Sequence, residues 1–235
     1  MKAKEKADFL VSYFEKHLPD AQTELHYANP YQLLVAVMLS AQCTDKRVNQ
    51  VTPAFFQAFP DVYTLANASF EDVFPLIKSI SYPNSKTRHL IAAAQAIVQQ
   101  YQGEIPRDVE SLMKLPGVGR KTANVLTAVL YEQPNMPVDT HVFRVSHRLG
   151  LVPTSARTPL KVEQRLVKLF PPDKIHKAHH WLILHGRYVC TARNPKCEIC
   201  GLKAICNYYQ RMERKKAVSP AQALSEKKKK RNTSS

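Results

Sequence analysis

The sequence predicts an all-α protein. Of its 235 residues, 44% are hydrophobic, which is enough to bury a substantial core. It has only 6 Gly against 16 Pro, and no run alternates apolar and polar residues between paired glycine turns, which argues against sandwiches, barrels and propellers. Apolar residues instead recur at three- and four-residue spacing, the period of an amphipathic helix.

Proline and glycine clusters separate ten segments with this helical period. In chain order they are Ala7–His17, Tyr31–Gln42, Lys46–Phe59, Phe70–Ser79, Ser85–Tyr101, Val109–Lys114, Arg120–Tyr131, Thr140–Leu149, Pro159–Leu169 and Lys177–Val189. The longest apolar stretch, Leu33–Leu39, is far shorter than the roughly twenty residues that cross a bilayer. We therefore expect no membrane partner.

The charge balance points to an anionic partner. The 34 Lys and Arg exceed the 19 Asp and Glu by 15. Residues 211–235 hold nine Lys or Arg and two Glu, a net charge of +7, so the rest of the chain keeps +8. The end of this segment, KKKKRNTSS, is almost free of apolar residues, so we expect a disordered basic tail that either aids solubility or binds nucleic acid. The first residues show no signal or transit pattern, which favours a reducing, cytosolic compartment.

The stretch LPGVGRKTA, residues 115–123, predicts a helix, a tight turn and a second helix. Pro116 ends the first helix, while Gly117 and Gly119 permit positive φ and let another backbone come close. The unpaired N–H groups at the start of the second helix suit a phosphate oxygen. An ordinary helical hairpin of a bundle is the alternative. The DNA contacts predicted for this turn are Gly117, Val118, Gly119 and Arg120.

A lysine and a carboxylate follow the turn. Lys121 falls in the first turn of the second helix, where the helix dipole and Arg120 disfavour a cation and so favour a neutral, nucleophilic amine. A phosphate contact is the ordinary alternative. Asp139 lies eighteen residues downstream in PVDTHVFR, at the N-cap of the next helix. It could be only a cap, or it could also shuttle protons and stabilise a developing sugar cation.

Four of the five cysteines crowd into one short segment. Cys190, Cys197, Cys200 and Cys206 give the spacing C-x6-C-x2-C-x5-C, which predicts metal ligation. Tetrahedral zinc remains possible, but zinc ribbons generally use two separated C-x2-C pairs, so an iron–sulfur cube fits better. Between the first two cysteines, TARNPK carries Arg193 and Lys196, a second predicted phosphate contact.

The segments LPGVGRKTA, VDTHVFR and LHGRYVC, with the cysteine spacing, resemble the endonuclease III family of helix-hairpin-helix DNA glycosylases. The resemblance implies a six-helix domain at residues 23–134, with the hairpin. It implies a second domain from residues 1–22 and 135–210 that binds a [4Fe-4S] cluster, with a cleft between the two domains. The basic tail, residues 211–235, lies beyond the resemblance.

The resemblance also implies an activity. Lys121 would form a Schiff base and Asp139 would assist it during excision of oxidised pyrimidines from duplex DNA, with strand cleavage by β-elimination. The implied protein is a base excision repair DNA glycosylase and abasic-site lyase. Its partner would be damaged double-stranded DNA, and we expect a monomer in the bacterial cytoplasm, at the nucleoid.

The damaged nucleotide must leave the duplex to be reached. Gln42, in LSAQCTD, is the candidate side chain that fills the gap. Asp45 and His141 resemble residues of the family's base pocket and cleft, although a cap role for Asp45 and a helix-start role for His141 are open alternatives.

The segment ISYPNSK, residues 80–86, resembles the family's wedge loop, and Ile80 and Tyr82 are its candidate DNA contacts. Ser81 and Pro83 stand where a glycine and a residue other than proline are usual, so insertion into the opposite strand is in question here.

Two other functions compete with this one. A catalytically silent DNA-binding protein could use the same hairpin and cluster. A mismatch-adenine glycosylase shares the cysteine pattern but usually lacks the lysine and adds a large C-terminal domain. The pair of Lys121 and Asp139 favours the bifunctional enzyme.

Overall fold

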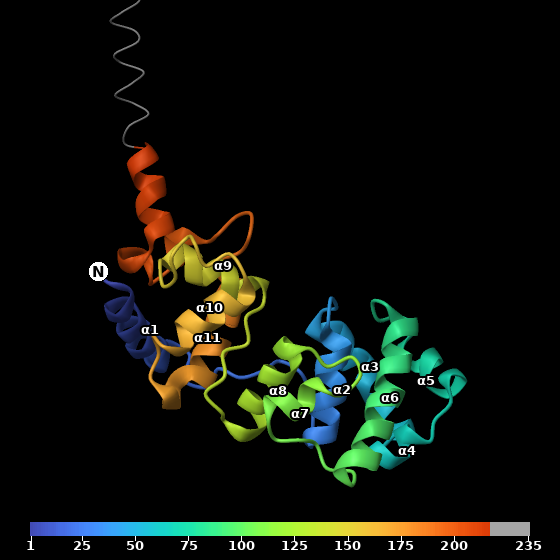
Figure 1. Ribbon diagram of the computed structural model, residues 1–235. Helices are drawn as coiled ribbons and strands as arrows, with labels where there is room; N and C mark the ends of the chain where they lie inside the picture. Colours follow the sequence, from blue (N-terminus) through green and yellow to red (C-terminus); the bar gives the residue numbers. More distant parts are fainter. Residues whose placement is uncertain (217–235) are drawn as a thin grey trace, which may run out of the picture. The chain divides into compact units, whose positions relative to one another are not determined.

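The computed structural model describes residues 1–216, which form helices and loops with no β-strand among them (Figure 1). The predicted all-α class is therefore confirmed. The chain divides into two compact units. One contains Gln22–Pro137 and Ile175–Lys177, and the other contains Met1–Ala21, Val138–Lys174 and the chain from Ala178 onward.

The unit that begins at Gln22 is built around one helix, α2 (Pro30–Ser40), whose residues 33–39 are all buried. Its helices are α2 (Pro30–Ser40), α3 (Asp45–Ala58), α4 (Val62–Ala66), α5 (Phe70–Ile77), α6 (Pro83–Tyr101), α7 (Val109–Met113) and α8 (Arg120–Tyr131). All residues from Leu33 to Leu39 of α2 are buried, as expected for a helix that is apolar on every side. Helices α3, α6 and α8 contact it.

The helix count of this unit differs from the prediction. The sequence predicts six helices between residues 23 and 134, whereas the structure adds α4, a single turn of five residues. A capping box joins Asp61 and Thr64 at its start. One turn is too short for apolar periodicity to be recognised, so only this capping pattern could have indicated it.

The other unit joins the first helix of the chain to the last part of the described chain. It contains α1 (Ala3–His17), α9 (Thr140–Leu149), α10 (Pro159–Val167), η1 (Pro172–Lys174), α11 (Ile175–Tyr188), η2 (Cys197–Ile199), η3 (Lys203–Ile205) and a helix at 207–216. The first three residues of α11, Ile175–Lys177, group with the unit that begins at Gln22. Leu10 and Phe14 of α1 and Trp181 of α11 are fully buried in its core.

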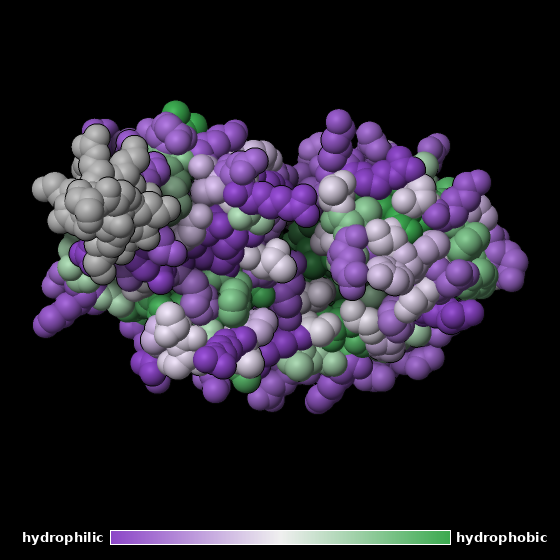
Figure 2. Space-filling model, turned by 90° about the horizontal axis from the view of Figure 1, so that it is seen from above, coloured by the Kyte–Doolittle hydropathy of each residue, from purple (hydrophilic) through white to green (hydrophobic). Residues whose placement is uncertain are grey.

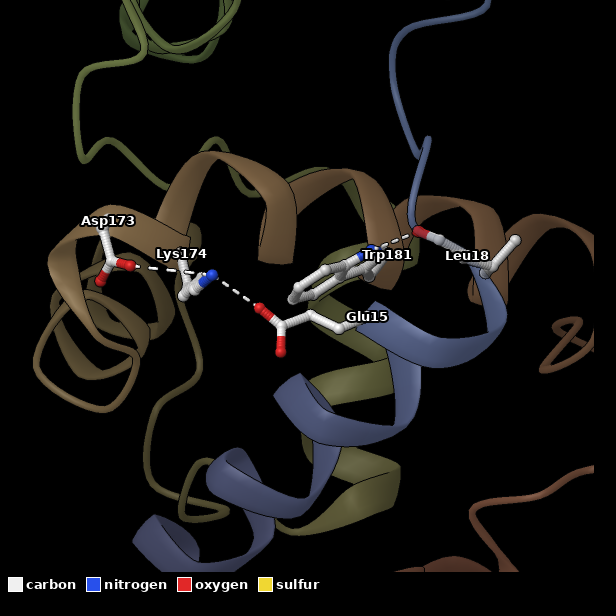
Figure 3. A network of polar contacts seen from close by, with 5 residues as sticks. All are labelled: Glu15, Leu18, Asp173, Lys174 and Trp181. Carbon is white, nitrogen blue, oxygen red and sulfur yellow. Dashed lines mark hydrogen bonds and ion pairs between the residues drawn. The ribbon is translucent and has the colours of Figure 1, made fainter.

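Polar contacts fix α1 to α11 and η1 (Figure 3). The indole Nε1 of Trp181 donates to the Leu18 carbonyl at 2.8 Å. The Lys174 ammonium lies 2.6 Å from a Glu15 carboxylate oxygen and 3.8 Å from an Asp173 carboxylate oxygen. The Phe14 ring stacks on Trp181 with centroids 5.9 Å apart. These contacts join α1 to segments that lie far from it in the sequence, 163 residues away in the case of Leu18 and Trp181.

The structure differs from the prediction at residues 211–216. Residues 211–216 belong to the helix that starts at 207, so the prediction of disorder from residue 211 is wrong for this stretch. The rest of that prediction, residues 217–235, lies outside the described residues.

Hydrophilic side chains cover most of the face in Figure 2. No helix within residues 1–216 is long and apolar enough to cross a membrane.

Candidate functional site

The hairpin turn is held to the core by its apolar residues. Leu115 and Val118 are buried, and the Val118 amide donates to the Leu115 carbonyl at 3.1 Å. The predicted helix, turn and helix are thus α7, residues 114–119 and α8. The side chain of Val118 packs in the core and its amide bonds within the turn. Gly117 and Gly119, on either side of it, are both exposed.

The two glycines are needed for different reasons. Gly117 has φ of +78°, and a Cβ placed there would lie 2.6 Å from the Cβ of His89, so the fold itself requires glycine. Gly119 has φ of −90° and ψ of 173°, so it does not use the positive φ that glycine permits. A Cβ at Gly119 would meet no atom of the described chain within 4 Å. Its missing side chain leaves room for something outside the protein.

Helix α8 begins without a side-chain cap. Gly119 is its N-cap and makes no capping hydrogen bond through a side chain. Arg120 and Lys121 are its first two residues, and both side chains are exposed. The helix start therefore combines N–H groups at the positive end of the dipole with two basic side chains, an arrangement suited to an anion.

Helix α9 begins with a carboxylate cap. The Oδ1 atom of Asp139 accepts a hydrogen bond from the Val142 amide at 2.7 Å, so the predicted N-cap is confirmed. Asp139 is half-buried. The cap needs only one of its two oxygens, so capping and a second role are compatible in the same side chain.

Arg144 connects the start of α9 to the cysteine segment. One of its terminal nitrogens lies 3.2 Å from Nδ1 of the half-buried His141 and donates to the Gly186 carbonyl at 2.8 Å. Its Nε donates to the Cys190 carbonyl at 3.1 Å. Burial and the neighbouring Arg148 lower the pKa of the Arg144 guanidinium. His141 is thus held by α9 itself and by the segment beside it.

The four clustered cysteines share one electrostatic environment. Cys190 follows α11, Cys197 is the first residue of η2, and Cys200 and Cys206 directly follow η2 and η3. Burial raises the pKa of the Cys197 and Cys200 thiols, and the neighbouring cysteines raise both further. Four thiolates could not coexist here without a compensating cation, which is the condition for metal ligation.

Several hydrogen-bond donors surround these sulfurs. Nη1 of Arg148 donates to the Cys190 sulfur at 3.3 Å, and the Tyr209 amide donates to the Cys206 sulfur at 3.5 Å. Nε2 of the buried His185 lies 3.8 Å from the Cys200 sulfur. No three His, Cys, Asp or Glu side chains within residues 1–216 are already spaced to hold a single metal ion. The donor set and its partners nevertheless fit a thiolate-bound iron–sulfur cluster.

Arg148 also fixes the loop between the first two cysteines. It donates to the carbonyls of Thr191 at 2.7 Å and Ala192 at 2.8 Å. Its guanidinium stacks on the Tyr208 ring, 4.5 Å from the centroid. The loop thus presents the exposed Arg193 and Lys196 on a backbone that the protein itself orders. The spacing of four from Arg144 places Arg148 on the same face of α9, but no local pattern in the sequence indicates that the cysteine segment is its partner.

The region around Gln42 differs from the prediction. The helix expected to include Gln42 ends at Ser40, and Gln42 is exposed with φ of +55°. Thr44, not Asp45, caps α3 through its hydroxyl. Asp45 is the half-buried first residue of that helix, so the alternative that Asp45 serves as the cap is wrong.

The candidate wedge segment has one buried and one exposed residue. Ile80 is only 2% exposed and belongs to the hydrophobic core. The prediction that its side chain contacts DNA is therefore wrong, because that side chain is packed inside the core. Tyr82 is 63% exposed with φ of +57°, directly before α6. Among the two candidates, the structure presents Tyr82 to solvent.

Comparison with known families matches both parts of the chain. Residues 35–172 match the model of the HhH-GPD superfamily base excision DNA repair proteins. Residues 190–206, which span the four cysteines, match the iron–sulfur binding domain of endonuclease III.

Individual relatives agree with these matches. Endonuclease III of Rickettsia conorii is 46% identical over 200 residues, covering 85% of this chain and 94% of the relative. Endonuclease III of Escherichia coli K12 is 38% identical over 204 residues, covering 87% and 96%. A trapped endonuclease III–DNA covalent intermediate is 39% identical with a TM-score of 0.85, covering 91% of this chain and all of that one. A thermostable thymine-DNA glycosylase, 22% identical with a TM-score of 0.80, shares the fold.

Proposed function

Because the chain belongs to the endonuclease III family of base excision DNA repair proteins, we propose that Lys121 is its Schiff-base nucleophile and Asp139 the carboxylate that assists it. The family membership makes the protein a DNA glycosylase that is also an abasic-site lyase. The observation that carries the residue assignment is the position of Lys121 in the exposed first turn of α8, directly after an uncapped glycine turn.

The chemistry of these two side chains accounts for both activities. The neutral Lys121 amine attacks C1′ of the deoxyribose, the C1′–base bond breaks, and the base leaves with its electron pair and takes up a proton. Asp139 accepts a proton from the attacking nitrogen and stabilises the positive charge on the sugar. The sugar ring then opens: the C1′–O4′ bond breaks, O4′ takes up the proton that Asp139 had accepted, and C1′ and the Lys121 nitrogen form an iminium. This iminium acidifies the 2′ proton, and loss of that proton expels the 3′ phosphate by β-elimination.

The substrate that fits this reading is an oxidised pyrimidine in duplex DNA. The nucleotide has to be rotated out of the stack, with Gln42 filling the space and with Asp45 and His141 facing the extruded base. The outer turn of the hairpin, Gly117 to Arg120, and the exposed Tyr82 would hold the backbone around the lesion. Support comes from the exposure of Gln42 and Tyr82 and from the empty space at Gly119.

The cofactor is a [4Fe-4S] cluster, as in the matched iron–sulfur domain, and we assign its ligands to Cys190, Cys197, Cys200 and Cys206. When bound, the cluster supplies four metal–thiolate bonds that cross-link this segment. The residues of the chain then orient the loop between the first two ligands. Arg148 fixes its backbone, and Arg193 and Lys196 would contact a phosphate.

We further propose that the protein acts as a monomer in the bacterial cytoplasm, at the nucleoid, where its duplex substrate lies. A single copy of the chain carries every residue assigned above. Sedimentation of the protein with and without a lesion duplex tests this assignment, and a dimer in the DNA-bound state would contradict it.

The ligand assignment predicts iron content. The purified protein should be yellow-brown with about four irons per chain, and Cys200→Ser should lower the iron content and the visible absorbance together. Cys43→Ser is the matched control, since Cys43 lies outside the cluster segment, and it should keep the full iron content. A colourless protein with one zinc per chain would contradict the assignment.

The nucleophile is tested by borohydride trapping on duplex DNA that contains thymine glycol. The wild type should form a covalent adduct. Lys121→Ala and Lys121→Arg should both lose the adduct by at least about a thousandfold because neither offers a reactive amine. The arginine variant keeps the positive charge and should keep its affinity for DNA. An undiminished adduct in either variant would mean that another residue is the nucleophile.

A further inference from the structure

Two loops of the unit that contains α2 to α8 carry unusual backbone conformations. The first, residues 41–44 between α2 and α3, is called the plug loop because it contains Gln42. The second, residues 80–82 before α6, is called the wedge loop. Gln42 and Tyr82 have φ of +55° and +57°, a left-handed conformation that non-glycine residues adopt at a cost in free energy. Such conformations persist only where surrounding contacts enforce them.

A hydrogen bond joins the two loops directly. The hydroxyl of Ser81 donates to the carbonyl of Gln42 at 2.8 Å. A glycine or alanine at position 81 would have no hydroxyl to make this bond. Ser81 thus supplies a contact from the wedge loop to the plug loop. The acceptor belongs to the left-handed residue itself.

A buried lysine makes a second connection. Lys86, in the first turns of α6, is only 8% exposed. Its ammonium donates to the carbonyls of Leu39 at 2.7 Å and Ala41 at 2.6 Å. These carbonyls lie at the C-terminal end of α2, where unpaired acceptors and the negative end of the helix dipole favour a cation. The Lys86 side chain therefore holds the end of α2 one residue before Gln42.

Burying the charged Lys86 ammonium costs desolvation free energy, which packing alone would not require. Burial lowers the pKa of its ammonium, and nearby Cys43 acts in the opposite direction. No carboxylate pairs with it among the ion pairs of the described residues. An apolar side chain could fill the same space without this desolvation cost. What the lysine adds is a fixed path for the chain that leaves α2.

We propose that Ser81 and Lys86 are positioning residues that lock the plug loop to the start of α6 and preorganise Gln42 for insertion into DNA. The proposal rests on the role of Gln42 given above. A preorganised plug avoids the ordering entropy that a mobile loop would lose on entering the duplex, so it lowers the barrier to extruding the damaged nucleotide. Neither residue touches the reacting atoms.

The first test needs no DNA. Amide hydrogen exchange at residues 41–44 of the full-length protein should be about three- to tenfold faster in Ser81→Ala than in the wild type, since one hydrogen bond is lost. The matched control is Ser85→Ala, because the exposed Ser85 hydroxyl makes no hydrogen bond within the described chain. Exchange at 41–44 that is equal in the wild type and Ser81→Ala would overturn the lock.

The second test measures extrusion. Single-turnover base excision by Ser81→Ala should be about three- to tenfold slower than by the wild type, and Ser81→Thr, which keeps a hydroxyl, should restore most of the rate. β-Elimination on a preformed abasic site, where no base is extruded, should change less. In a Gln42→Ala background the Ser81 substitution should have no further effect, because the two act as one unit. An undiminished Ser81 effect in that background would refute positioning through Gln42.

Lys86→Met tests the second connection. A folded Lys86→Met protein should show faster exchange at 41–44 and slower excision than Ser81→Ala, because two hydrogen bonds are lost rather than one. Unchanged exchange would overturn the role of Lys86. A failure of this variant to fold would assign Lys86 to the fold and leave Ser81 as the sole positioning residue.

The outcomes separate this proposal from the proposed function. If the wild type formed no borohydride-trapped adduct with DNA, the glycosylase assignment would be overturned. The hydrogen-exchange measurement on the free protein would still decide whether the lock exists. Conversely, an active enzyme in which Gln42→Ala excises at the wild-type rate would refute the plug role and with it the purpose of the lock.

Discussion

Helices α8 and α9 begin in opposite ways although both present the positive end of a helix dipole. Helix α8 starts at Gly119 with no side-chain cap, and its first residues are Arg120 and Lys121. Helix α9 starts at Asp139, whose carboxylate accepts the Val142 amide at 2.7 Å. One helix start is therefore open toward an external anion, and the other is already satisfied by an internal one.

The difference shows how the same backbone physics supports two roles. Unpaired N–H groups need an acceptor. Where the sequence supplies glycine, that acceptor can be a DNA phosphate, and in the proposed mechanism this contact would bring Lys121 to the sugar. Where the sequence supplies aspartate, the carboxylate of the chain itself accepts a hydrogen bond from an amide of the first turn. The predictions below test this contrast, from the largest expected effect to the smallest.

Among variants that keep Lys121, the largest effect is expected at the start of α9. Asp139→Asn should retain the cap, because asparagine caps helices as well as aspartate does, so the free energy of unfolding should change by less than about 0.5 kcal/mol. Base excision should fall by about a hundredfold or more because the charge is lost. Asp139→Ala should show the same loss of activity and about 1 kcal/mol of lost stability. Single-turnover kinetics with denaturant unfolding measures both quantities, and an active Asp139→Asn enzyme would reduce Asp139 to a cap.

A smaller effect is expected at the start of α8. Gly119→Ala should leave the stability within about 1 kcal/mol of the wild type, since its φ of −90° and open surroundings accept a methyl group. Its affinity for DNA should fall by roughly tenfold, because a phosphate can no longer approach the backbone closely.

Gly117→Ala provides the contrast to that variant. A Cβ there would lie 2.6 Å from the Cβ of His89 at a φ of +78°, so this substitution should destabilise the protein by more than about 1 kcal/mol. Thermal unfolding and fluorescence-detected DNA titration measure the two effects separately. Equal affinities of Gly119→Ala and the wild type would show that the open space is not a DNA contact.

The smallest effect concerns salt. If Arg120 contacts one phosphate, Arg120→Ala should reduce the slope of log Kd against log salt concentration by about one. Arg157→Ala, which removes an exposed arginine between α9 and α10, is the control and should leave the slope unchanged. Titrations at several salt concentrations measure the slopes. A slope that falls equally in both variants would attribute the effect to net charge rather than to the start of α8.

The local elements of both helix starts could be predicted from the sequence. The predicted segments Arg120–Tyr131 and Thr140–Leu149 are the observed α8 and α9. The cap at Asp139 was also predicted correctly. Glycine, aspartate and apolar period act within a few residues of one another, so a short stretch of sequence contains the whole cause.

Other features depended on distant contacts and could not be predicted in this way. Ile80 is a large apolar residue in a loop, as a wedge residue would be, but it is buried in the core of the unit that contains α2 to α8. Gln42 continues an apolar helical pattern, but α2 ends before it, where Lys86 binds the last carbonyls. Arg148 gives no local signal, yet it meets a cysteine 42 residues away.

The sequence by itself determined the helical class, the open and capped starts of α8 and α9, and the four-thiolate donor set, because each follows from residues close together in the chain. Only the tertiary structure decided which glycine the fold requires, which loop residues face solvent and which buried cations bind backbone carbonyls. These features depend on which segments distant in sequence pack together, and free energies of packing and desolvation select those neighbours only once the whole chain has folded.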